Sequence, residues 1–306
     1  MARSLRDIRR KMKAIKATRQ VTKAMELVSA SKMRRAVQNA QTLRSYALAA
    51  WEVLQKMAAV QAGGHPFLTE RPAKKVLALV FTSDRGLCGS LNAQVLRTVN
   101  AYLRGLKEFK TVEKIDFAAI GRKGQQFLHR NGENVVAAFP ALSNHPQFRD
   151  VLPIARMAID GFRDGTYDHV VLIYTDFISA LLQEPTVKVL LPFSQSELKE
   201  MIGGLVQSKK TDVPAELVLP KSEYTFEPSP ADVLDRILPQ LTEIQIYQGV
   251  LESAASEHSA RMVAMRNASD NASDIIDDLT LTYNQTRQAS ITAELAELSA
   301  SKAALE

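Results

Sequence analysis

The residues with the strongest chemical signature form one short loop, SDRGLCGSLN, at positions 83–92. It follows an apolar run, VLALVFT (76–82), that is typical of a buried strand, and it precedes a predicted helix (93–106). A strand, a glycine-containing loop and a helix in this order look like a phosphate-binding turn. The loop has neither the GxGxxG spacing nor the GxxxxGK[ST] residues that reach phosphate and magnesium. A structural role is therefore favoured, with glycines forming the turn and with Asp84 and Arg85 capping or pairing.

No other combination of residues in the sequence points to catalysis. Cys88 is the only cysteine, which excludes an internal disulfide and a cysteine-rich metal site, and it suits a small packed position. The five histidines have no HExxH or similar spacing. The sequence shows no Ser/His/Asp set, carboxylate pair or metal-ligand cluster, so it predicts no catalytic residue, no cofactor and no metal site. It also contains no run of about 18 apolar residues, the length that predicts a membrane-spanning helix.

The middle of the chain alternates between strand-like and helix-like patterns. Short apolar runs separated by turn residues predict strands, and the stretches between them predict helices. Such alternation is typical of an open, parallel or mostly parallel sheet with helices on its faces. Residues 207–229 are expected to form irregular structure plus an edge strand. The predicted strands are 76–82, 115–120, 135–139, 170–174 and 187–191, and the predicted helices are 93–106, 122–129 and 152–162.

Glycine and proline are confined to this middle part. All 13 glycines and all 12 prolines lie between residues 63 and 249, so the first 62 and the last 57 residues contain neither. In a helix interior these residues cost roughly 1 and 3 kcal/mol respectively. Their absence, together with many Ala, Leu, Met, Lys, Arg, Glu and Gln residues, predicts one very long helix at each end of the chain.

Apolar residues in both end segments follow the alternating three- and four-residue spacing of a left-handed coiled coil. The second helix is expected from about Pro239 to Leu298, which makes it roughly 90 Å long. Pro239 then falls near its base, where a bend does least harm. The predicted seam positions are Leu5, Ile8, Met12, Ile15, Val21, Met25, Val28, Met33, Val37, Ala40, Leu43, Ala47, Ala50, Leu54 and Met57 in the first segment, and Ile237, Leu241, Ile244, Gln248, Leu251, Ala255, His258, Met262, Met265, Ser269, Ala272, Ile276, Leu279 and Tyr283 in the second.

The two end segments carry opposite charge. Residues 1–62 hold 14 Lys or Arg against 3 acidic residues, a net charge of +11, whereas residues 250–306 hold 4 against 9, a net charge of −5. Opposite charges favour an antiparallel pair, and the sequence leaves its register open. Four aspartates on adjoining helix positions are expected to face basic residues of the first segment, either 16–23 or 32–35. These aspartates are Asp270, Asp274, Asp277 and Asp278.

Together these patterns predict an α/β protein, in which a long antiparallel coiled coil of the N- and C-terminal helices carries an inserted open α/β sheet domain of the Rossmann-like type. The predicted boundaries are 1–62 for the N-terminal helix, 63–229 for the sheet domain and 230–306 for the C-terminal helix. The sheet domain is too small to cover helices of this length, so the helices must project from it.

Four segments spread over the chain carry more specific patterns. They are ATRQVTKAMELVSASKMRRA (17–36), TSDRGLCGSLN (82–92), ARMVAMRNASDNA (260–272) and YNQTRQASITAELAEL (283–298). Together they resemble the γ subunit family of the rotary F-type ATP synthase, and the resemblance covers nearly the whole chain. The middle lacks the cysteine-bearing regulatory insertion of the chloroplast form, which argues against thiol control of that kind.

This resemblance implies a non-catalytic subunit, the central rotor shaft that couples transmembrane ion flow to ATP synthesis and hydrolysis in a surrounding catalytic ring. It implies as partners the alpha and beta subunits of the catalytic head, the epsilon subunit and the membrane c-ring. It also implies a peripheral location on the cytoplasmic face of the cell membrane, as part of the complex.

The resemblance also suggests which residues make contacts. Lys23 and Met25 in TKAMELV, and Arg287 and Gln288 in TRQASIT, are expected to contact the catalytic ring, and the Arg287 fork suits a carboxylate partner. The alternative is that Lys23 and Arg287 are solvated or pair within the shaft. Two residues of EYTFEP are expected to face the membrane rotor ring, namely Tyr224 and Glu227.

The residues leave a second class of function open, a basic-armed coiled coil that binds nucleic acid. A net charge of +11 over 62 residues favours salt-dependent binding to a duplex. Against this, Tyr46 and Trp51 are the only aromatic residues of that arm, and the other end of the chain is acidic. A third class, an enzyme built on the sheet domain, has no site to support it.

Overall fold

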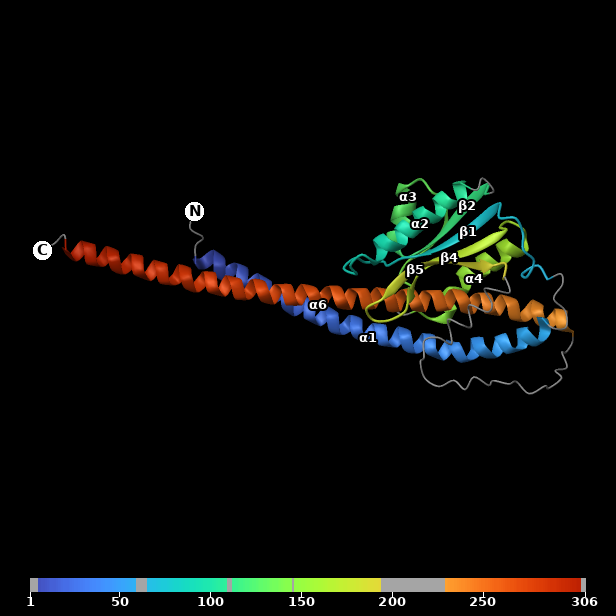
Figure 1. The fold of residues 1–306 in the computed structure, drawn as a ribbon, viewed down its shortest axis with the longest axis horizontal. Coiled ribbons are helices and arrows are strands. Elements are labelled where there is room, and N and C mark those ends of the chain that lie inside the picture. Colours follow the sequence, from blue (N-terminus) through green and yellow to red (C-terminus); the bar gives the residue numbers. More distant parts are fainter. Residues whose placement is uncertain (1–4, 59–64, 109–111, 145, 194–228, 304–306) are drawn as a thin grey trace. The chain divides into compact units, whose positions relative to one another are not determined.

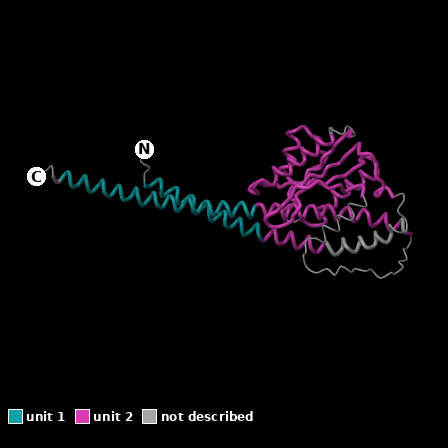
Figure 2. The backbone as a smooth tube through the Cα atoms, in the orientation of Figure 1, with its two compact units in different colours: residues 1–30, 261–306 teal, residues 31–260 magenta. Residues whose placement is uncertain are grey.

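In the computed structural model of this chain, the described residues are 5–58, 65–108, 112–144, 146–193 and 229–303. Contacts group the chain into two compact units, residues 1–30 with 261–306 and residues 31–260 (Figure 2). The elements in chain order (Figure 1) are α1 (Leu5–Ala58), β1 (Lys75–Phe81), α2 (Leu91–Glu108), β2 (Lys114–Ile120), α3 (Arg122–Arg130), β3 (Val135–Phe139), α4 (Phe148–Arg163), β4 (His169–Phe177), β5 (Gln183–Leu191) and α6 (Pro230–Ala303).

The two long helices expected at the ends of the chain are both present. In the described residues the first spans Leu5–Ala58, 54 residues, and the second spans 74 residues. The predicted start of the second helix at Pro239 is wrong, because α6 begins at Pro230. Ser229 caps this end, since its Oγ accepts a hydrogen bond from the Asp232 N–H at 3.2 Å, and proline suits the first helical position. The helix continues through Pro239, where burial of the flanking Leu238 offsets the missing backbone hydrogen bond.

The smaller unit pairs the start of α1 with the end of α6. On α6 the predicted seam is confirmed at Met265, Ser269, Ala272 and Ile276, all of which are buried. On α1 the prediction holds at Ile8 but is wrong at two valines farther along. Val21 and Val28 are 58% and 56% exposed, and the residues buried in their place are Thr22, Glu26 and Ser29. The contact face of α1 therefore lies one residue C-terminal to the predicted seam in this stretch.

The larger unit contains a five-stranded sheet in the order β3-β2-β1-β4-β5. All five predicted strands are present, and β1, β2, β3 and β4 run parallel. Strand β5 runs antiparallel to β4, with Val171 opposite Val189, because the short segment between them permits only a hairpin. This order, with crossover helices, is that of an open doubly wound sheet, as the sequence predicts. The predicted irregular region and edge strand at 207–229 fall, except for Ser229, outside the described residues.

Helices cover both faces of this sheet (Figure 1). On one face, Val95 and Leu103 of α2 and Leu128 of α3 pack against Val80 and Ala119 of the strands. On the other face the apolar side chains come from α4 and from the first part of α6. They include Ile154, Phe162, Leu238, Leu241 and Val250. The C-terminal helix is thus also a core element of the sheet domain. Within the described ranges, every helix falls short of the apolar length that crossing a bilayer requires.

Candidate interaction site on the paired helices

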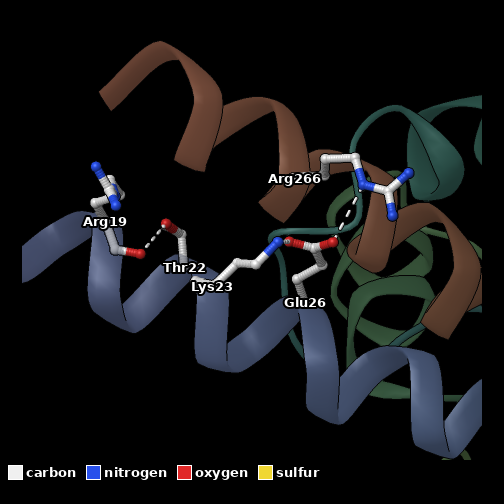
Figure 3. Close-up of polar contacts among 5 residues, drawn as sticks. All are labelled: Arg19, Thr22, Lys23, Glu26 and Arg266. Atoms are coloured by element: carbon white, nitrogen blue, oxygen red, sulfur yellow. Dashed lines mark hydrogen bonds and ion pairs between the residues drawn. The ribbon is translucent and has the colours of Figure 1, made fainter. Parts of the chain in front are cut away.

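Glu26 is a buried acidic residue of the smaller unit that pairs with two cations (Figure 3). Its side chain is only 5% exposed, and its carboxylate accepts hydrogen bonds from Lys23 Nζ at 2.9 Å and from Arg266 Nε at 3.1 Å. The Lys23 hydrogen bond is the largest cause that lowers the pKa of the Glu26 carboxyl below its ordinary value, and Arg266 lowers it further, while burial opposes both. The carboxylate therefore stays ionised and joins a cation on α1 to one on α6.

Two other polar contacts join the same helices. Arg19 donates to Ser273 Oγ at 3.0 Å, and Arg9 donates to Tyr283 Oη at 2.7 Å while its guanidinium lies over the tyrosine ring. In both of these pairs, and in the Glu26–Arg266 pair, the two residue numbers add up to 292. This constant sum defines an antiparallel pairing with one register along the whole unit, which the sequence had left open.

This register does not give the expected pairing of the four C-terminal aspartates. Asp270, Asp274, Asp277 and Asp278 are exposed, and none of them forms an ion pair with a described residue. That expectation is wrong because these aspartates lie on the side of α6 opposite its buried seam. The interhelical ion pair that does form has the opposite polarity. Its acid, Glu26, comes from the basic helix, and its base, Arg266, comes from the acidic one.

The outer surface of α1 carries an apolar stripe. Five exposed small or branched apolar residues repeat at spacings of three and four, which places them on one face of the helix. This face is not the one that contacts α6. We call it the outer stripe, and it consists of Ala14, Ala17, Val21, Ala24 and Val28. Apolar residues that keep a heptad spacing on an exposed face indicate a surface that a partner covers.

The residues expected to contact a catalytic ring lie at two separate levels of the smaller unit. Lys23 is 57% exposed although it pairs with Glu26, and Met25 is half-buried. Arg287 and Gln288 are both exposed, and no described residue pairs with either of them. By the register, these two levels are about 30 Å apart along α6. The expected contacts with the catalytic ring therefore fall at two levels. Tyr224 and Glu227, which are expected to face the membrane rotor ring, lie outside the described residues.

A further apolar stripe lies at the end of α6. By the register, Leu5 is opposite Arg287, so the described part of α1 offers no partner to α6 beyond this point. Ile291, Leu295 and Leu298 repeat at spacings of four and three and are all exposed. This tip stripe was not predicted from the sequence, although its three- and four-residue spacing within ITAELAEL indicates it.

The loop at 83–92 has a structural role, and the prediction of capping holds for Asp84 but not for the Arg85 side chain. Asn92 accepts a hydrogen bond from the Ser83 N–H at 3.0 Å and donates to Cys88 Sγ at 3.3 Å. Asp84 accepts from the N–H of Arg122, which is the first residue of α3, and therefore caps that helix. The Arg85 side chain is exposed, and in the described contacts this residue contributes only its carbonyl, which accepts from the Ser83 hydroxyl at 2.6 Å.

Helix α6 fills the crevice where a nucleotide binds in sheets of this type. That crevice lies at the carboxyl ends of β1 and β4, where the strand order reverses. Here Val250, Ser253 and Glu257 of α6 close it against Thr82 and Thr175, leaving a cavity of about 10 Å³, enough for one water molecule. Across the described segments, no three His, Cys, Asp or Glu residues are grouped to hold a metal ion.

Comparison of the sequence with known proteins places these features in context. The model of a family described as ATP synthase matches residues 4–305. The chain is 44% identical over 305 residues to the ATP synthase gamma chain of Roseiflexus castenholzii, an alignment that covers 99% of this chain and 98% of that one. It is 41% identical over 311 residues to the ATP synthase gamma chain of Herpetosiphon aurantiacus, with 99% of both chains covered.

Solved structures show the same fold. A chain from the central stalk and c-ring of the Tetrahymena thermophila mitochondrial ATP synthase is 25% identical, with a TM-score of 0.57 over 81% of this chain and 99% of that chain. A chain of the Euglena gracilis mitochondrial ATP synthase, in a structure of its OSCP, F1 and c-ring, is 18% identical, with a TM-score of 0.60 over 98% of this chain and 94% of that chain. None of these similarities supports the nucleic-acid-binding alternative.

Proposed function

This chain belongs to the ATP synthase gamma chain family, and we propose that its two long helices act as the rotor shaft that couples transmembrane ion flow to ATP synthesis and hydrolysis. It is a central stalk subunit and not the catalytic one. The expected partners are the alpha and beta subunits that surround the shaft, the epsilon subunit and the membrane c-ring. As part of a membrane-bound complex, the chain is expected to lie peripherally on the cytoplasmic face of the cell membrane.

The observation that carries this proposal is the outer stripe. An isolated two-helix rod gains nothing from apolar residues on its outer face, whereas a rod inside a ring of subunits buries them. The other helix exposes the four aspartates, so the rod differs chemically from face to face. Such asymmetry is necessary, because a rotor that contacts every conformation of the ring equally well shifts none of them.

The proposal assigns roles to residues and segments. Lys23 and Met25 contact the ring beside the outer stripe, and Arg287 and Gln288 contact it near the tip. Tyr224 and Glu227 are proposed to face the membrane rotor ring. In mechanical terms the chain divides into a shaft helix at 1–62, a sheet domain at 63–229 and a second shaft helix at 230–306.

Reconstitution with alpha and beta subunits from the same source tests both the function and the stripe. The chain alone should hydrolyse no ATP, and its addition should restore ATP hydrolysis to the ring. Val28→Asp places a charge on the outer stripe, and we expect it to lower the ATPase rate of the complex at least fivefold, because burying a carboxylate without a partner is costly.

Val136→Asp serves as the matched control, since Val136 is similarly exposed but lies on β3. It should leave the rate unchanged. If the Val28→Asp complex is as active as the unaltered one, the outer stripe is not the contact. If the chain does not co-purify with alpha and beta subunits, the rotor function itself is rejected.

A further inference from the structure

A basic hollow lies in the larger unit where three segments meet. Its volume is about 220 Å³. Lys32, Arg35 and Asn39 line it from α1, His258 lines it from α6, and Ser143 and Gln147 line it from the segment between β3 and α4. None of these residues takes part in the shaft contacts described above, and we call this site the basic hollow.

The positive charge of the basic hollow is not neutralised within the described part of the chain. Lys32 Nζ donates to Asn144 Oδ1 at 3.3 Å, and an amide oxygen carries no formal charge. Arg35 is exposed and forms no ion pair with any described residue, and none of the described residues that line the hollow is a carboxylate. Two cations one helical turn apart, facing a concave surface without an acid, attract an anion.

The wall opposite these cations is held in place. The Tyr247 hydroxyl donates to the Pro146 carbonyl at 3.2 Å, and the Tyr247 ring packs edge-on against Phe148 with their centroids 5.6 Å apart. Helix α6 therefore holds Pro146 and Phe148, the two neighbours of Gln147, in place. Donors that are already in position lose little conformational entropy when a ligand binds.

We propose that the basic hollow binds a small oxyanion of the phosphate class. The guanidinium of Arg35 matches two phosphate oxygens at once, and the Lys32 ammonium adds a point charge. Amide and hydroxyl groups of Asn39, Ser143 and Gln147 supply further hydrogen-bond donors. Together these donors exceed the number of hydrogen bonds that a single carboxylate can accept. The volume is below the roughly 300–1,000 Å³ of sites for drug-sized ligands, which favours orthophosphate or pyrophosphate over a nucleotide.

The position of the hollow gives such binding a consequence for the shaft. An anion held there touches α1, α6 and the segment before α4 at once. It therefore ties the two long helices to the sheet domain within the larger unit. Bound phosphate stabilises this junction, and the stabilisation increases with the phosphate concentration.

Titration of the purified full chain tests the proposal independently of any rotary activity. Isothermal calorimetry with orthophosphate, pyrophosphate and ATP as separate ligands, at constant ionic strength in chloride, identifies the form that binds. We expect one site, with a dissociation constant for orthophosphate or pyrophosphate in the millimolar range or tighter. Arg35→Gln should weaken binding at least tenfold, and Arg34→Gln, the same change at a neighbouring exposed arginine that does not line the hollow, should change it less than twofold.

Circular dichroism of both variants establishes that the helices remain intact. The proposal is overturned if no anion binds saturably, or if the two arginine variants weaken binding equally, since the effect is then one of general charge. It is also overturned if phosphate fails to bind while Arg35→Gln weakens assembly with the other subunits. In that case the hollow receives an acidic side chain from a partner.

Discussion

At the scale of single residues, Glu252 is a carboxyl group whose pKa is raised above its ordinary value. It lies on α6 against the sheet, where Gln248 Nε2 donates to its carboxyl at 2.7 Å and the Tyr174 hydroxyl also hydrogen-bonds to it. Burial is the main cause that raises the pKa of Glu252 to about 7, and the nearby Asp176 carboxylate raises it further.

The raised pKa of Glu252 predicts a stability change with a definite sign. Because the folded-state pKa of about 7 exceeds the ordinary value of 4.5, the neutral form favours the folded state. This contribution is complete below pH 4.5 and is lost as the pH rises through 7. Between pH 5 and pH 8 the loss is about 2 kcal/mol in the free energy of unfolding.

Glu252→Gln should abolish this drop and make the chain more stable than the unaltered protein at pH 8. Denaturant unfolding of the full chain at both pH values measures the change. Glu297→Gln, at an exposed position of the same helix, should leave the pH dependence as it is. An equal drop in the Glu252→Gln protein would show that other groups are responsible.

At the scale of elements, Pro239 is a local defect inside α6. It lacks the N–H that bonds the carbonyl four residues earlier, and its ring crowds that carbonyl. Pro239→Ala restores the hydrogen bond but enlarges the conformational freedom of the unfolded chain. We expect a net gain of about 1–2 kcal/mol in the free energy of unfolding, measured by denaturant titration.

Pro230→Ala is the control for this gain, because proline at the first helical position breaks no hydrogen bond. It should change the free energy of unfolding by no more than about 0.5 kcal/mol, towards lower stability. A loss of stability in the Pro239→Ala protein would show instead that a bend at Pro239 is required to pack Leu238 and Leu241 in the core of the sheet domain.

The same scale explains which features the sequence predicts. Strands such as 115–120 and the long helices depend on local patterns, so their positions were predicted within a few residues. The exception is the start of α6, which was predicted at Pro239 and lies at Pro230. The contact face of α1 depends on the residues of α6 that oppose it. Glu26 is buried because Arg266 lies opposite, which no pattern within α1 reveals. The exposure of Val21 and the loss of the expected aspartate pairs follow from that register.

The candidate site likewise has features that the sequence predicted and features that only the structure shows. The four residues expected to contact the ring were identified from family resemblance. The structure adds that they lie at two levels and that Lys23 pairs with Glu26. The outer stripe is a heptad pattern in the sequence, but Val21 and Val28 were assigned to the inner seam. Only the structure shows which side of the helix the partner helix occupies.

At the scale of the whole molecule, the exposed apolar stripes of the two long helices are surfaces that other subunits cover in the proposed rotor. The tip stripe shows this most directly, because Ile291, Leu295 and Leu298 lie on a part of α6 that has no described partner helix. Burying these three side chains against a surrounding ring gains several kcal/mol, at about 25 cal/mol per Å² of apolar surface. The isolated chain gains nothing from them.

Leu295→Asp should therefore separate folding from assembly. At an exposed helix position it should change the unfolding free energy of the isolated chain by less than about 0.5 kcal/mol. In the complex it places a charge where an apolar contact forms, so the affinity for the alpha and beta subunits should fall at least tenfold, as measured by co-purification at graded concentrations. Ala293→Asp adds the same charge on the opposite side of the helix and should weaken assembly much less. If both substitutions lowered the affinity equally, assembly would depend on the charge at this end of α6 and not on its apolar face.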